Sequence, residues 1–489
     1  MKTATIVIKD EVNIKLEGLE LDMRQRLVKQ FKYDVPYARY LPAVRLGRWD
    51  GKVSYFQLGG STYTNLLPEI IPILEQYNYN IELDDQRDYS VSFDFDRVEE
   101  NRWAYKTWPK GHPAEGEPIM IRDYQVEIVN NFLQNPQCIQ EIATGAGKTI
   151  MTATLSAAVE PYGRSIVIVP NKSLVTQTEK DYVNLGLDVG VYFGDRKEHG
   201  RTHTICTWQS LNVLLKNTKS GTADITIADF IEDVVCVMVD EVHMAKADAL
   251  KTLLTGVMSC IPIRWGLTGT IPKEKFESQS LLVSLGPVIG KLSANELQQQ
   301  GVLAQCHVNI VQLQDHVEYP DYQKELKYLL EESGRLDTMA ELIRKVNETG
   351  NTLVLVDRTE CGRQLVERLG DKSVFVSGAT KSKDRQEEYD QVAEATDKII
   401  VATYGVAAVG INIPRIFNLV LIEPGKSFVR VIQSIGRGIR KAEDKDHVQI
   451  WDVTSTCKFA KRHLTKRKAY YREANYPFTQ EKLEWMKVK

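Results

Sequence analysis

The stretch EIATGAGKTI, residues 141–150, places two glycines, a lysine and a threonine between a strand-like segment and a helix-like one. Because glycine has no Cβ, Gly145 and Gly147 allow the backbone N–H groups to turn towards one centre and phosphate oxygens to approach closely. Lys148 would then reach the β- and γ-phosphates of a nucleotide, and the Thr149 hydroxyl would bind Mg²⁺. The spacing therefore predicts a phosphate-binding loop at the start of a helix.

The loop departs from the usual pattern in one place, because Ile142 occupies the position of its first glycine. A strand-to-helix turn that binds no ligand is therefore the alternative interpretation. Elsewhere in the chain, nearly continuous apolar segments each end in a small, polar or turn residue and alternate with helix-like segments. This alternation is typical of an α/β fold with buried parallel strands. The apolar segments are SIVIVP, VVCVMVD, NTLVLVD, KIIVATY, NLVLIEP and VQIWDV.

These segments fall into two groups, one between about residues 115 and 275 and one between about 300 and 455. Residues 288–305 separate them and are predicted to form a linker with a helix. We expect an α/β protein with two tandem parallel-sheet domains and a small N-terminal α/β (α+β) accessory domain. The predicted domains are 1–110, 111–290, and 291–489 with a basic C-terminal tail.

Composition sets limits on the class of protein. The chain has 489 residues, of which 43% are hydrophobic and 26% charged, and these values are typical of a globular protein. No apolar run reaches the ~18 residues that a membrane span needs, and no signal peptide is recognisable, so a cytoplasmic location is expected, in the host if the source is a phage. The seven cysteines form no C-x-x-C pair and are predicted to be buried, reduced thiols. The net charge of −3 does not exclude nucleic-acid binding by local basic patches.

An acidic pair supports the nucleotide interpretation. The sequence DEVH, residues 240–243, ends the apolar segment VVCVMVD about 90 residues after the loop. In parallel sheets the carboxyl ends of the strands meet at one edge, where ligands bind. Asp240 is suited to Mg²⁺ coordination and Glu241 to orienting an attacking water, whereas the alternative is that the pair only caps the next helix. Together with the phosphate-binding loop, the acidic pair Asp240–Glu241 predicts a site that hydrolyses ATP.

The second group of segments adds cations. Gln433, Arg437 and Arg440 in VIQSIGRGIRKA have the spacing of one helix face. Guanidinium groups there are suited to the charge that develops on a triphosphate, although a basic surface helix is the alternative. Thr403 ends another predicted strand, and Gly410 lies in the loop that follows.

The motifs from about residue 118 to 455 resemble those of the superfamily 2 helicases and occur in the family's order. Within this family the non-glycine at position 142 is not an exception. One position departs from the family, because Asn412 stands where an aspartate is usual. The matching segments are IRDYQ (121–125), ATGAGKT (143–149), VPNKSLVTQ (169–177), TWQSL (207–211), DEVH (240–243), GLTGT (266–270), LVLVDRTECGRQL (353–365), ATYGVAAVGINIP (402–414) and QSIGRGIR (433–440).

The resemblance implies two RecA-like domains that use ATP and Mg²⁺ to drive movement on nucleic acid. It assigns metal contacts to Thr149 and Asp240. The implied catalytic residues are Lys148, Asp240, Glu241, Gln433, Arg437 and Arg440. The implied nucleotide contacts are Arg122, Gln125, Thr144, Gly145, Ala146, Gly147, Lys148, Thr149 and Gly410.

The nucleic acid is expected to be DNA, because the chain lacks the DEAD, SAT and PTRELA sequences of the RNA-remodelling branch. Strand contacts are expected from Lys172, Gln209, Ser210, Arg358 and Thr403, although each could instead be an ordinary surface residue. A further DNA contact is predicted near the N-terminus, where basic and aromatic residues flank the turn WDG on an expected hairpin tip: Arg45, Arg48, Trp49 and Lys52. The alternative is that the aromatics here form a small core, and for Phe31 and Tyr55 this is preferred.

Resemblance to recombination and fork-remodelling members of the family implies branched DNA as substrate: Holliday junctions, stalled forks, D-loops and R-loops. The expected partners are single-stranded and branched DNA, RNA–DNA hybrids, and recombination or replication proteins, with the chain itself monomeric. A double-stranded DNA translocase or an RNA helicase without general unwinding remains the alternative. A P-loop kinase is disfavoured, because it has no use for QSIGRGIR.

Overall fold

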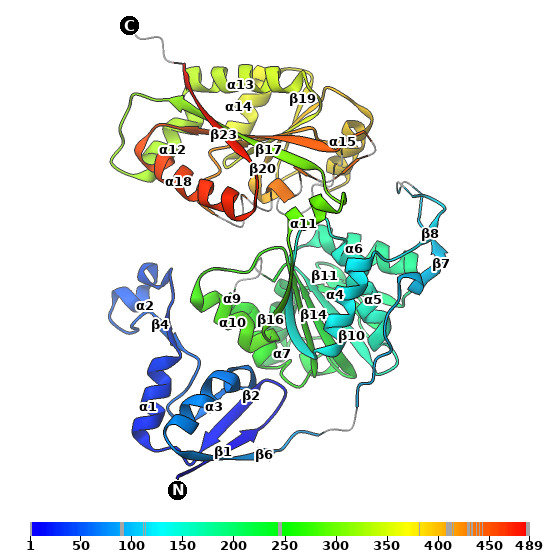
Figure 1. Ribbon diagram of the computed structural model, residues 1–489, viewed down its shortest axis with the longest axis vertical. Helices are drawn as coiled ribbons and strands as arrows, with labels where there is room; N and C mark the ends of the chain where they lie inside the picture. The colour runs from blue at the N-terminus through cyan, green and yellow to red at the C-terminus, as the bar shows by residue number, and fades with distance from the viewer. Residues whose placement is uncertain are drawn as a thin grey trace. The chain divides into compact units, whose positions relative to one another are not determined.

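The computed structural model describes residues 2–88, 92–110, 112, 114–242, 247–380, 382–406, 413, 415–427, 431, 434–436, 438–439, 441–442 and 444–485. These residues form two compact units (Figure 1). The first consists of Met1–Ile142 and Gly147–Lys291, and the second of Ala143–Ala146 and Leu292–Lys489. Each contains a large, mainly parallel sheet with helices on both faces, so the predicted α/β class is confirmed.

The N-terminal part of the first unit is a small α+β domain built on a four-stranded sheet in the order β5-β2-β1-β6. Phe31 and Tyr55 are fully buried in its core, as predicted. The sheet strands are β1 (Lys2–Ile8), β2 (Asn13–Glu17), β5 (Ser61–Tyr63) and β6 (Tyr79–Asp85), packed with α1 (Leu21–Gln30) and α3 (Leu67–Gln76). A separate two-stranded ribbon is formed by β3 (Lys32–Asp34) and β4 (Lys52–Ser54), and their connection contains η1 (Ala38–Tyr40) and α2 (Pro42–Arg45).

This small domain is fixed to the rest of the first unit by polar and apolar contacts. The Tyr55 hydroxyl lies 3.0 Å from the Phe276 carbonyl oxygen and 2.6 Å from Ser280 Oγ. The Asn13 amide donates to the Thr255 carbonyl at 2.9 Å. The side chain of Phe276 is part of the same buried cluster as Phe31 and Tyr55. The N-terminal domain and the first parallel sheet therefore share one hydrophobic core region.

The first parallel sheet has the strand order β12-β11-β13-β10-β14-β15-β9-β16. In Figure 1, α4, α5 and α6 cover one of its faces, and α7, α9 and α10 cover the other. The strands are β9 (Gln137–Ile142), β10 (Arg164–Val169), β11 (Val189–Phe193), β12 (Arg196–Lys197), β13 (His203–Thr207), β14 (Val234–Asp240), β15 (Ile263–Thr268) and β16 (Val288–Leu292). The helices are α4 (Asp123–Gln134), α5 (Lys148–Val159), α6 (Lys172–Leu185), α7 (Trp208–Ser220), α8 (Ile227–Phe230), α9 (Ala247–Thr255) and α10 (Lys275–Leu285), and the hairpin of β7 (Trp103–Thr107) and β8 (Pro118–Ile119) precedes them.

The linker prediction for residues 288–305 is wrong for its first part. Residues 288–292 are the edge strand β16 of the first sheet, beside β9. This strand is hydrogen-bonded to β9 and is therefore part of the first sheet, not a free connection between domains. Only the middle of the segment is a helix, α11 (Ala294–Gln299), which Ser293 caps through its side chain.

The second unit contains a seven-stranded sheet in the order β19-β20-β18-β21-β22-β17-β23, and all of its pairings are parallel. The strands are β17 (Gln305–Gln314), β18 (Thr352–Val356), β19 (Ser373–Val376), β20 (Ile399–Thr403), β21 (Asn418–Ile422), β22 (His447–Ser455) and β23 (Phe478–Glu484). The helices include α12 (Tyr322–Glu331), α13 (Ser333–Asn347), α14 (Thr359–Leu369), α15 (Ser382–Glu394) and α18 (Lys458–Glu473). Figure 1 shows α13 and α14 on one face of this sheet and α18 on the other.

The two sheets have the same topology. In chain order, the six main strands lie in the sequence third, fourth, second, fifth, sixth, first: β11-β13-β10-β14-β15-β9 in the first unit and β19-β20-β18-β21-β22-β17 in the second. All six apolar segments singled out in the sequence are strands of these sheets. Because the main strands are parallel, their carboxyl ends meet at one edge of each sheet, where α/β proteins bind ligands.

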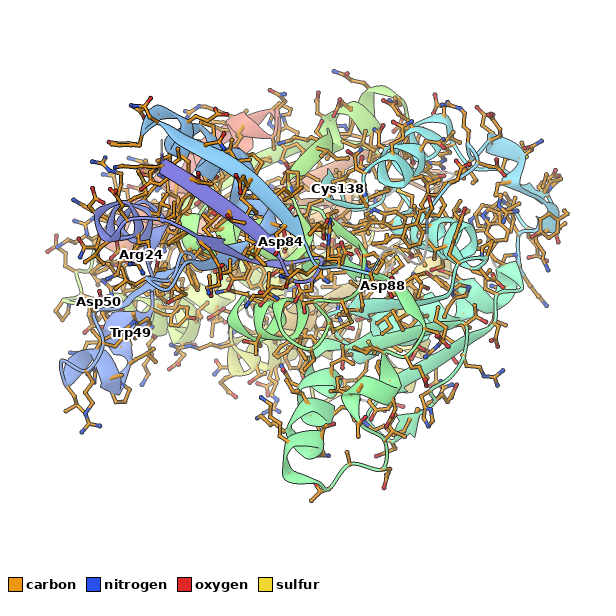
Figure 2. All side chains as sticks on the ribbon, turned by 90° about the horizontal axis from the view of Figure 1, so that it is seen from below. Arg24, Trp49, Asp50, Asp84, Asp88 and Cys138 are labelled. Atoms are coloured by element: carbon orange, nitrogen blue, oxygen red, sulfur yellow. The ribbon has the colours of Figure 1, made fainter. Side chains whose placement is uncertain are left out.

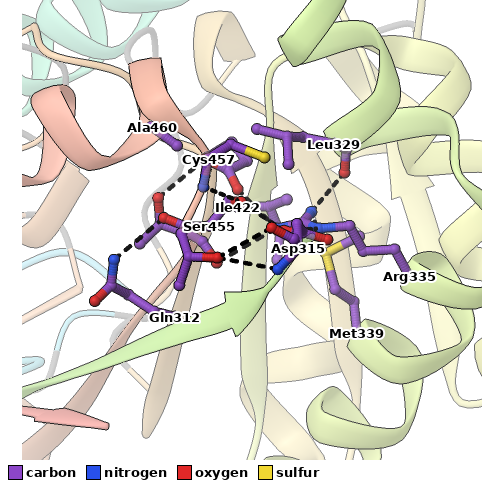
Figure 3. A network of polar contacts seen from close by, with 12 residues as sticks. Gln312, Asp315, Leu329, Arg335, Met339, Ile422, Ser455, Cys457 and Ala460 are labelled. Atoms are coloured by element: carbon purple, nitrogen blue, oxygen red, sulfur yellow. Dashed lines mark hydrogen bonds and ion pairs between the residues drawn. The ribbon is translucent and has the colours of Figure 1, made fainter. Parts of the chain in front are cut away.

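A buried charge network supports that edge in the second unit (Figure 3). The Arg335 side chain on α13 is fully buried, with its Nε 3.2 Å from Asp315 Oδ2 and one Nη 2.8 Å from Glu423 Oε1. Ser455 also donates to Asp315, and the Thr454 hydroxyl donates to Glu423 at 3.1 Å. Burial raises the pKa of Glu423 to about 6, although Arg335 opposes that shift.

The cysteine prediction holds for six residues and fails for one. All seven are free thiols, and six are buried, but Cys260 is exposed in the segment between α9 and β15. Burial raises the pKa of Cys138 to about 12, so that thiol is inert. Within the ranges that the structure describes, no helix is both long and apolar enough to cross a membrane.

Candidate ATP-binding site and nucleic-acid surfaces

The predicted phosphate loop joins β9 to α5 and has a left-handed backbone at both glycines, with φ of 90° at Gly145 and 84° at Gly147. A Cβ on Gly147 would lie 2.5 Å from Nε2 of Gln125, so a larger residue would also collide with that side chain. Ile142 is fully buried as the last residue of β9. Its side chain therefore belongs to the core, which explains why this position does not require glycine.

Gln125 is positioned beside the loop by the start of α4. Its Oε1 accepts the backbone N–H of Arg122 at 3.0 Å, and Arg122 also donates to the Tyr124 hydroxyl at 3.2 Å. Gln125 is buried and its amide nitrogen faces Gly147. The structure thus places Gln125 beside the phosphate loop. Arg122 lies next to Gln125, at the N-terminus of α4.

The loop lysine and the acidic pair meet at the carboxyl edge of the first sheet. Lys148 Nζ lies 2.9 Å from Glu241 Oε1, and both side chains are only 9% exposed. The Asp240 carboxylate accepts the Glu241 backbone N–H at 2.9 Å. The other Glu241 oxygen lies 3.4 Å from the backbone nitrogen of Gly269, in the GLTGT segment after β15. Three motifs predicted separately from the sequence therefore converge on one carboxylate.

Glu241 has an unusual backbone, with φ of +51°. A residue with a Cβ is rarely left-handed, and such strain costs on the order of 1–3 kcal/mol where it persists. The conformation turns the chain sharply at the end of β14, and Glu241 as a whole residue is buried. Strain of this kind gathers at functional positions, which agrees with the predicted role of Glu241.

The donor set is chemically suited to a nucleotide and a hard cation. Thr149, the second residue of α5, supplies a hydroxyl, and the half-buried Asp240 supplies a carboxylate, both oxygen ligands of the kind that Mg²⁺ prefers. Lys148 supplies the cation for phosphates. Thr144 and Ala146 are buried in the same loop, and the Ala146 backbone N–H donates to the Ala143 carbonyl at 3.3 Å.

One aromatic pair near this site was missed in the sequence. The rings of Trp108 and His112 stack in parallel, with centroids 3.9 Å apart and an interplanar angle of 7°. Burial, and after it the positive charge of Arg122, lowers the pKa of His112. Both residues belong to the turn between β7 and β8, upstream of every motif, and only the aromatic composition of that turn could have indicated them.

The predicted residues of the second half are only partly described. Gln433, Arg437, Arg440 and Gly410 lie outside the described residues, as does Asn412. Val431, Ile435 and Ile439 are fully buried at a spacing of four, which is the pattern of one helix face. Thr403 is the last residue of β20 and is half-buried at the carboxyl edge of the second sheet.

The residues that are predicted to contact a DNA strand differ in how exposed their side chains are. Lys172 is exposed at the start of α6, and the exposed Gln209 lies 3.4 Å from the Pro170 carbonyl, so both occupy adjacent strand ends of the first sheet. Ser210 is only 9% exposed, and its hydroxyl pairs with Thr207 Oγ1 at 2.9 Å in the cap of α7, so its contact with a strand stays a prediction. Arg358 begins α14 and forms a 3.1 Å ion pair with Glu331.

The basic residues near the N-terminus lie on a lobe formed by residues 35–51, which connects β3 to β4. The expected tight hairpin tip is wrong, since the connection contains η1 and α2. Arg45, Arg48 and the adjoining Lys52 are exposed. Trp49, labelled in Figure 2, is half-buried against the N-terminal core and donates its Nε1–H to the Lys52 carbonyl at 2.8 Å. Trp49 therefore packs to stabilise the lobe, and its ring is only partly available for stacking on a base.

Other side chains of the lobe are more available. Tyr40 is 59% exposed and Leu46 64% exposed. The Arg39 guanidinium lies over the Tyr40 ring at 4.7 Å from its centroid and donates to its hydroxyl at 2.7 Å. An exposed aromatic ring beside arginines is suited to a nucleic acid, through stacking and phosphate contacts. These residues were missed because the sequence pattern drew attention to the turn WDG.

Comparison with known proteins agrees with this geometry. The model of the Type III restriction enzyme res subunit matches residues 118–273, and the Helicase conserved C-terminal domain matches residues 334–442. The first match contains the phosphate loop, the acidic pair and GLTGT. The second contains the segments from LVLVDRTECGRQL to QSIGRGIR.

Individual relatives extend the similarity across the chain. The ATP-dependent DNA helicase uvsW of Enterobacteria phage T4 is 24% identical over 465 residues, covering 90% of this chain and 88% of the phage protein. The DNA 3'-5' helicase XPB of Kineococcus radiotolerans is 25% identical over 370 residues, covering 73% and 64%. A solved HsdR fragment of a type I restriction enzyme from Vibrio vulnificus shares the fold, with a TM-score of 0.56, 16% identity, and 96% and 85% coverage. With both helicase domains present in order, the chain belongs to the superfamily 2 helicases and is an ATP-hydrolysing enzyme.

Proposed function

We propose that this helicase moves on DNA and remodels branched intermediates, by branch migration of Holliday junctions, fork regression and unwinding of D-loops and R-loops. The observation that carries the proposal is the lobe of residues 35–51, an exposed basic and aromatic surface on a domain fixed to the first core. The T4 relative, named an ATP-dependent DNA helicase, is similar over nine-tenths of the chain, including part of this domain.

The proposed hydrolysis uses the residues gathered around Lys148. Its ammonium group, 2.9 Å from Glu241, would bind the β- and γ-phosphates, and Glu241 would orient the attacking water. Thr149 and Asp240 would hold Mg²⁺, which when bound neutralises charge on the phosphates. Gln125 and Arg122 would contact the adenine side. The Glu241 contact to Gly269 offers a route by which the nucleotide state reaches the GLTGT segment.

The second core would complete the reaction. We propose that Gln433, Arg437 and Arg440 contact the triphosphate together with Gly410, so that hydrolysis depends on a bound strand bringing the cores together. Domains 1–110, 111–290 and 291–489 would then correspond to substrate choice, ATP binding and completion of the ATPase site. Lys172, Gln209, Arg358 and Thr403 would follow the sugar–phosphate backbone without sequence preference.

A pair of substitutions tests the hydrolysis. Lys148→Ala and Glu241→Gln should each abolish DNA-stimulated ATP hydrolysis, while the Glu241→Gln variant still binds a fluorescent ATP analogue. Normal turnover in either variant would contradict the assignment. Lys180→Ala, an exposed position in the middle of α6, is the matched control and should leave turnover unchanged.

A second experiment tests the choice of substrate. Arg45→Ala with Arg48→Ala should weaken binding to a four-way junction and reduce the log–log salt slope by about 0.9 per lost phosphate contact. ATPase stimulated by a short single strand should survive, because the cores are intact. Equal junction affinity in the double variant and the wild type would refute the role of the lobe. Failure to unwind any labelled branch, despite stimulated ATPase, would favour a double-stranded DNA translocase.

A further inference from the structure

Helix α18 in the second unit has one face that is buried and one that is strongly basic. Ala460, Leu464 and Tyr471 are buried against the sheet. The opposite face is exposed over the whole helix. Its cations recur at the three- and four-residue spacing of a single helical face: Lys458, Lys461, Arg462, Lys466 and Arg472.

These five cations are not neutralised within the described residues, where no carboxylate oxygen lies within 4.0 Å of any of them. The helix's other arginine, Arg467, is buried and forms a two-pronged ion pair with Asp452 at 2.8 and 2.9 Å. Glu325 is also buried and accepts the backbone N–H groups of Phe459 and Ala460, so its charge is directed at the helix N-terminus. Asp452 and Glu325 are thus engaged in the interior, and the single acidic residue of α18 itself is Glu473, exposed at the last position of the helix.

The positive field extends to the neighbouring loop. Lys426 is exposed after β21, and the Tyr470 hydroxyl of α18 donates to its backbone carbonyl at 2.9 Å. His463 of α18 has a pKa lowered to about 4, first by burial and then by the charges of Lys426, Arg467 and Lys466. A cationic patch of this density on a chain with a net charge of −3 indicates an anionic partner.

We propose that the exposed face of α18 binds the sugar–phosphate backbone of duplex DNA, as a second contact in the proposed remodelling of branched DNA, on which this inference rests. The helix has 16 residues and is about 24 Å long at about 1.5 Å per residue. That length spans about seven phosphates along one strand of B-DNA. A rigid row of fixed charges of this length matches a rigid row of phosphates.

Other anionic partners fit less well. A membrane-bound amphipathic helix must insert its apolar face, but Leu464 and Tyr471 of α18 are already packed in the protein. Between its cations the exposed face offers only Thr465 and Ala469. The nearest aromatic rings, Phe459 and Phe478, are half-buried, and the guanidinium groups of Arg462 and Arg472 lie 5.8 and 5.4 Å from their centroids. These rings are therefore less available as the anchors of a protein interface or as stacking platforms for a single strand. A predominantly cationic surface instead favours phosphates of a duplex.

The position of α18 agrees with this role. The helix begins just after the carboxyl end of β22, which runs parallel to β21, β18 and β20. Arg358 follows β18, and Thr403 ends β20, at the same edge of the sheet. The basic face therefore starts at the edge where the second core would hold the tracked strand, so an adjoining duplex arm could continue along it.

Neutralising the middle of the face tests the proposal. Lys461→Gln, Arg462→Gln and Lys466→Gln combined in the full chain should lower the log–log salt slope of four-way-junction binding by about 2.7, or 0.9 for each contact. Junction affinity at 0.15 M salt should fall roughly 10- to 100-fold. Affinity for a short single strand, and the ATPase that it stimulates, should change less than twofold.

Two controls keep the test specific. The charge-retaining set Lys461→Arg, Arg462→Lys and Lys466→Arg should behave like the wild type. Lys324→Gln with Lys327→Gln on α12 removes cations that are paired with Asp321 and Glu331, at 3.6 and 3.9 Å, and should leave the slope unchanged. Thermal melting of each variant checks that the folded state is retained.

The outcomes separate the two proposals. An unchanged slope and junction affinity in the neutralised variant would overturn the role of α18. A parallel loss of single-strand affinity and of stimulated ATPase would also overturn it, since α18 would then lie on the tracked strand. If the wild type showed no DNA-stimulated ATPase, the proposed function would fail, while the salt slopes would still decide whether α18 binds duplex DNA.

Discussion

Replacing Arg335 with methionine isolates the contribution of the buried network in the second core. The guanidinium group is fully buried and contacts two carboxylates, Asp315 at 3.2 Å and Glu423 at 2.8 Å. Methionine fills a similar volume without the charge, so the change leaves two buried acids without their cation. Removing one partner of a buried ion pair destabilises a protein by about 3–5 kcal/mol.

The loss of stability caused by Arg335→Met should come mainly from the unpaired carboxylate of Glu423. Asp315 keeps its hydrogen bonds from Ser455, from the Trp485 indole at 3.0 Å and from Tyr328 at 3.3 Å. Burial already raises the pKa of Glu423 to about 6 in the presence of Arg335. Without Arg335 this pKa rises further, and each further unit corresponds to about 1.4 kcal/mol. Glu423 should then be protonated in the folded variant near neutral pH, which limits the loss.

Hydrogen exchange read by mass spectrometry is the suitable assay, because it reports on one region of a protein with several domains. Peptides from α13 and β21 should lose about 3–5 kcal/mol of protection, an acceleration of roughly 150- to 4,000-fold where exchange follows global opening of the core. Adding Glu423→Gln to Arg335→Met should restore part of the protection. Arg368→Met, which removes an ion pair to the 65% exposed Asp337, is the control and should cost at most about 1 kcal/mol. Equal protection in the Arg335 and Arg368 variants would refute the argument.

Three further changes give direct tests. Trp108→Ala should raise the KM for ATP several-fold with little change in kcat if the Trp108–His112 stack contacts the base, and an unchanged KM would exclude this. Glu423 has a folded-state pKa of about 6 against an ordinary value of 4.5, so its contribution to the free energy of unfolding is greatest below pH 4.5 and is lost as the pH rises through 6. Relative to Glu423→Gln, the wild type should lose about 2 kcal/mol of unfolding free energy across that window, as measured by urea unfolding. Parallel plots of unfolding free energy against pH for the two proteins would contradict the shift. Arg437→Ala should still bind ATP and DNA but lose stimulation of the ATPase by DNA, and retained stimulation would make Arg437 structural.

The sequence was most informative where backbone geometry restricts residue choice. Gly145 and Gly147, singled out because glycine lets the backbone turn sharply, are both left-handed, and Asp240 ends a strand that Glu241 follows, as the apolar run before them indicated. Side-chain availability was harder to predict. Ser210 resembles a surface hydroxyl in sequence, but its pairing with Thr207 depends on how α7 begins. Arg335 resembles an exposed helix residue, because no local pattern shows that two carboxylates from distant segments surround it.

The matching topology of the two cores gives Arg335 a further meaning. Lys148 begins the helix after the first strand of core one and pairs with Glu241, which follows the fifth strand with φ of +51°. Arg335 lies in the first turn of α13, the second of the two helices between the first and second strands of core two, and pairs with Glu423, which follows the fifth strand with φ of +41°. A cation on the first crossover thus pairs with the carboxylate after the fifth strand in both cores, although Arg335 lies one helix later than Lys148.

The Lys148–Glu241 and Arg335–Glu423 pairs differ in the groups that surround them. Lys148 follows a loop with left-handed glycines at positions 145 and 147, and its side chain is 9% exposed. Arg335 has no such loop before it and is enclosed by Asp315 and the carbonyl oxygen of Thr454. An added anion would have to displace a carboxylate that already satisfies the guanidinium. We therefore expect the Lys148–Glu241 pair to open when a nucleotide binds, whereas the enclosed Arg335–Glu423 pair stays closed and fixes the carboxyl ends of β21 and β22.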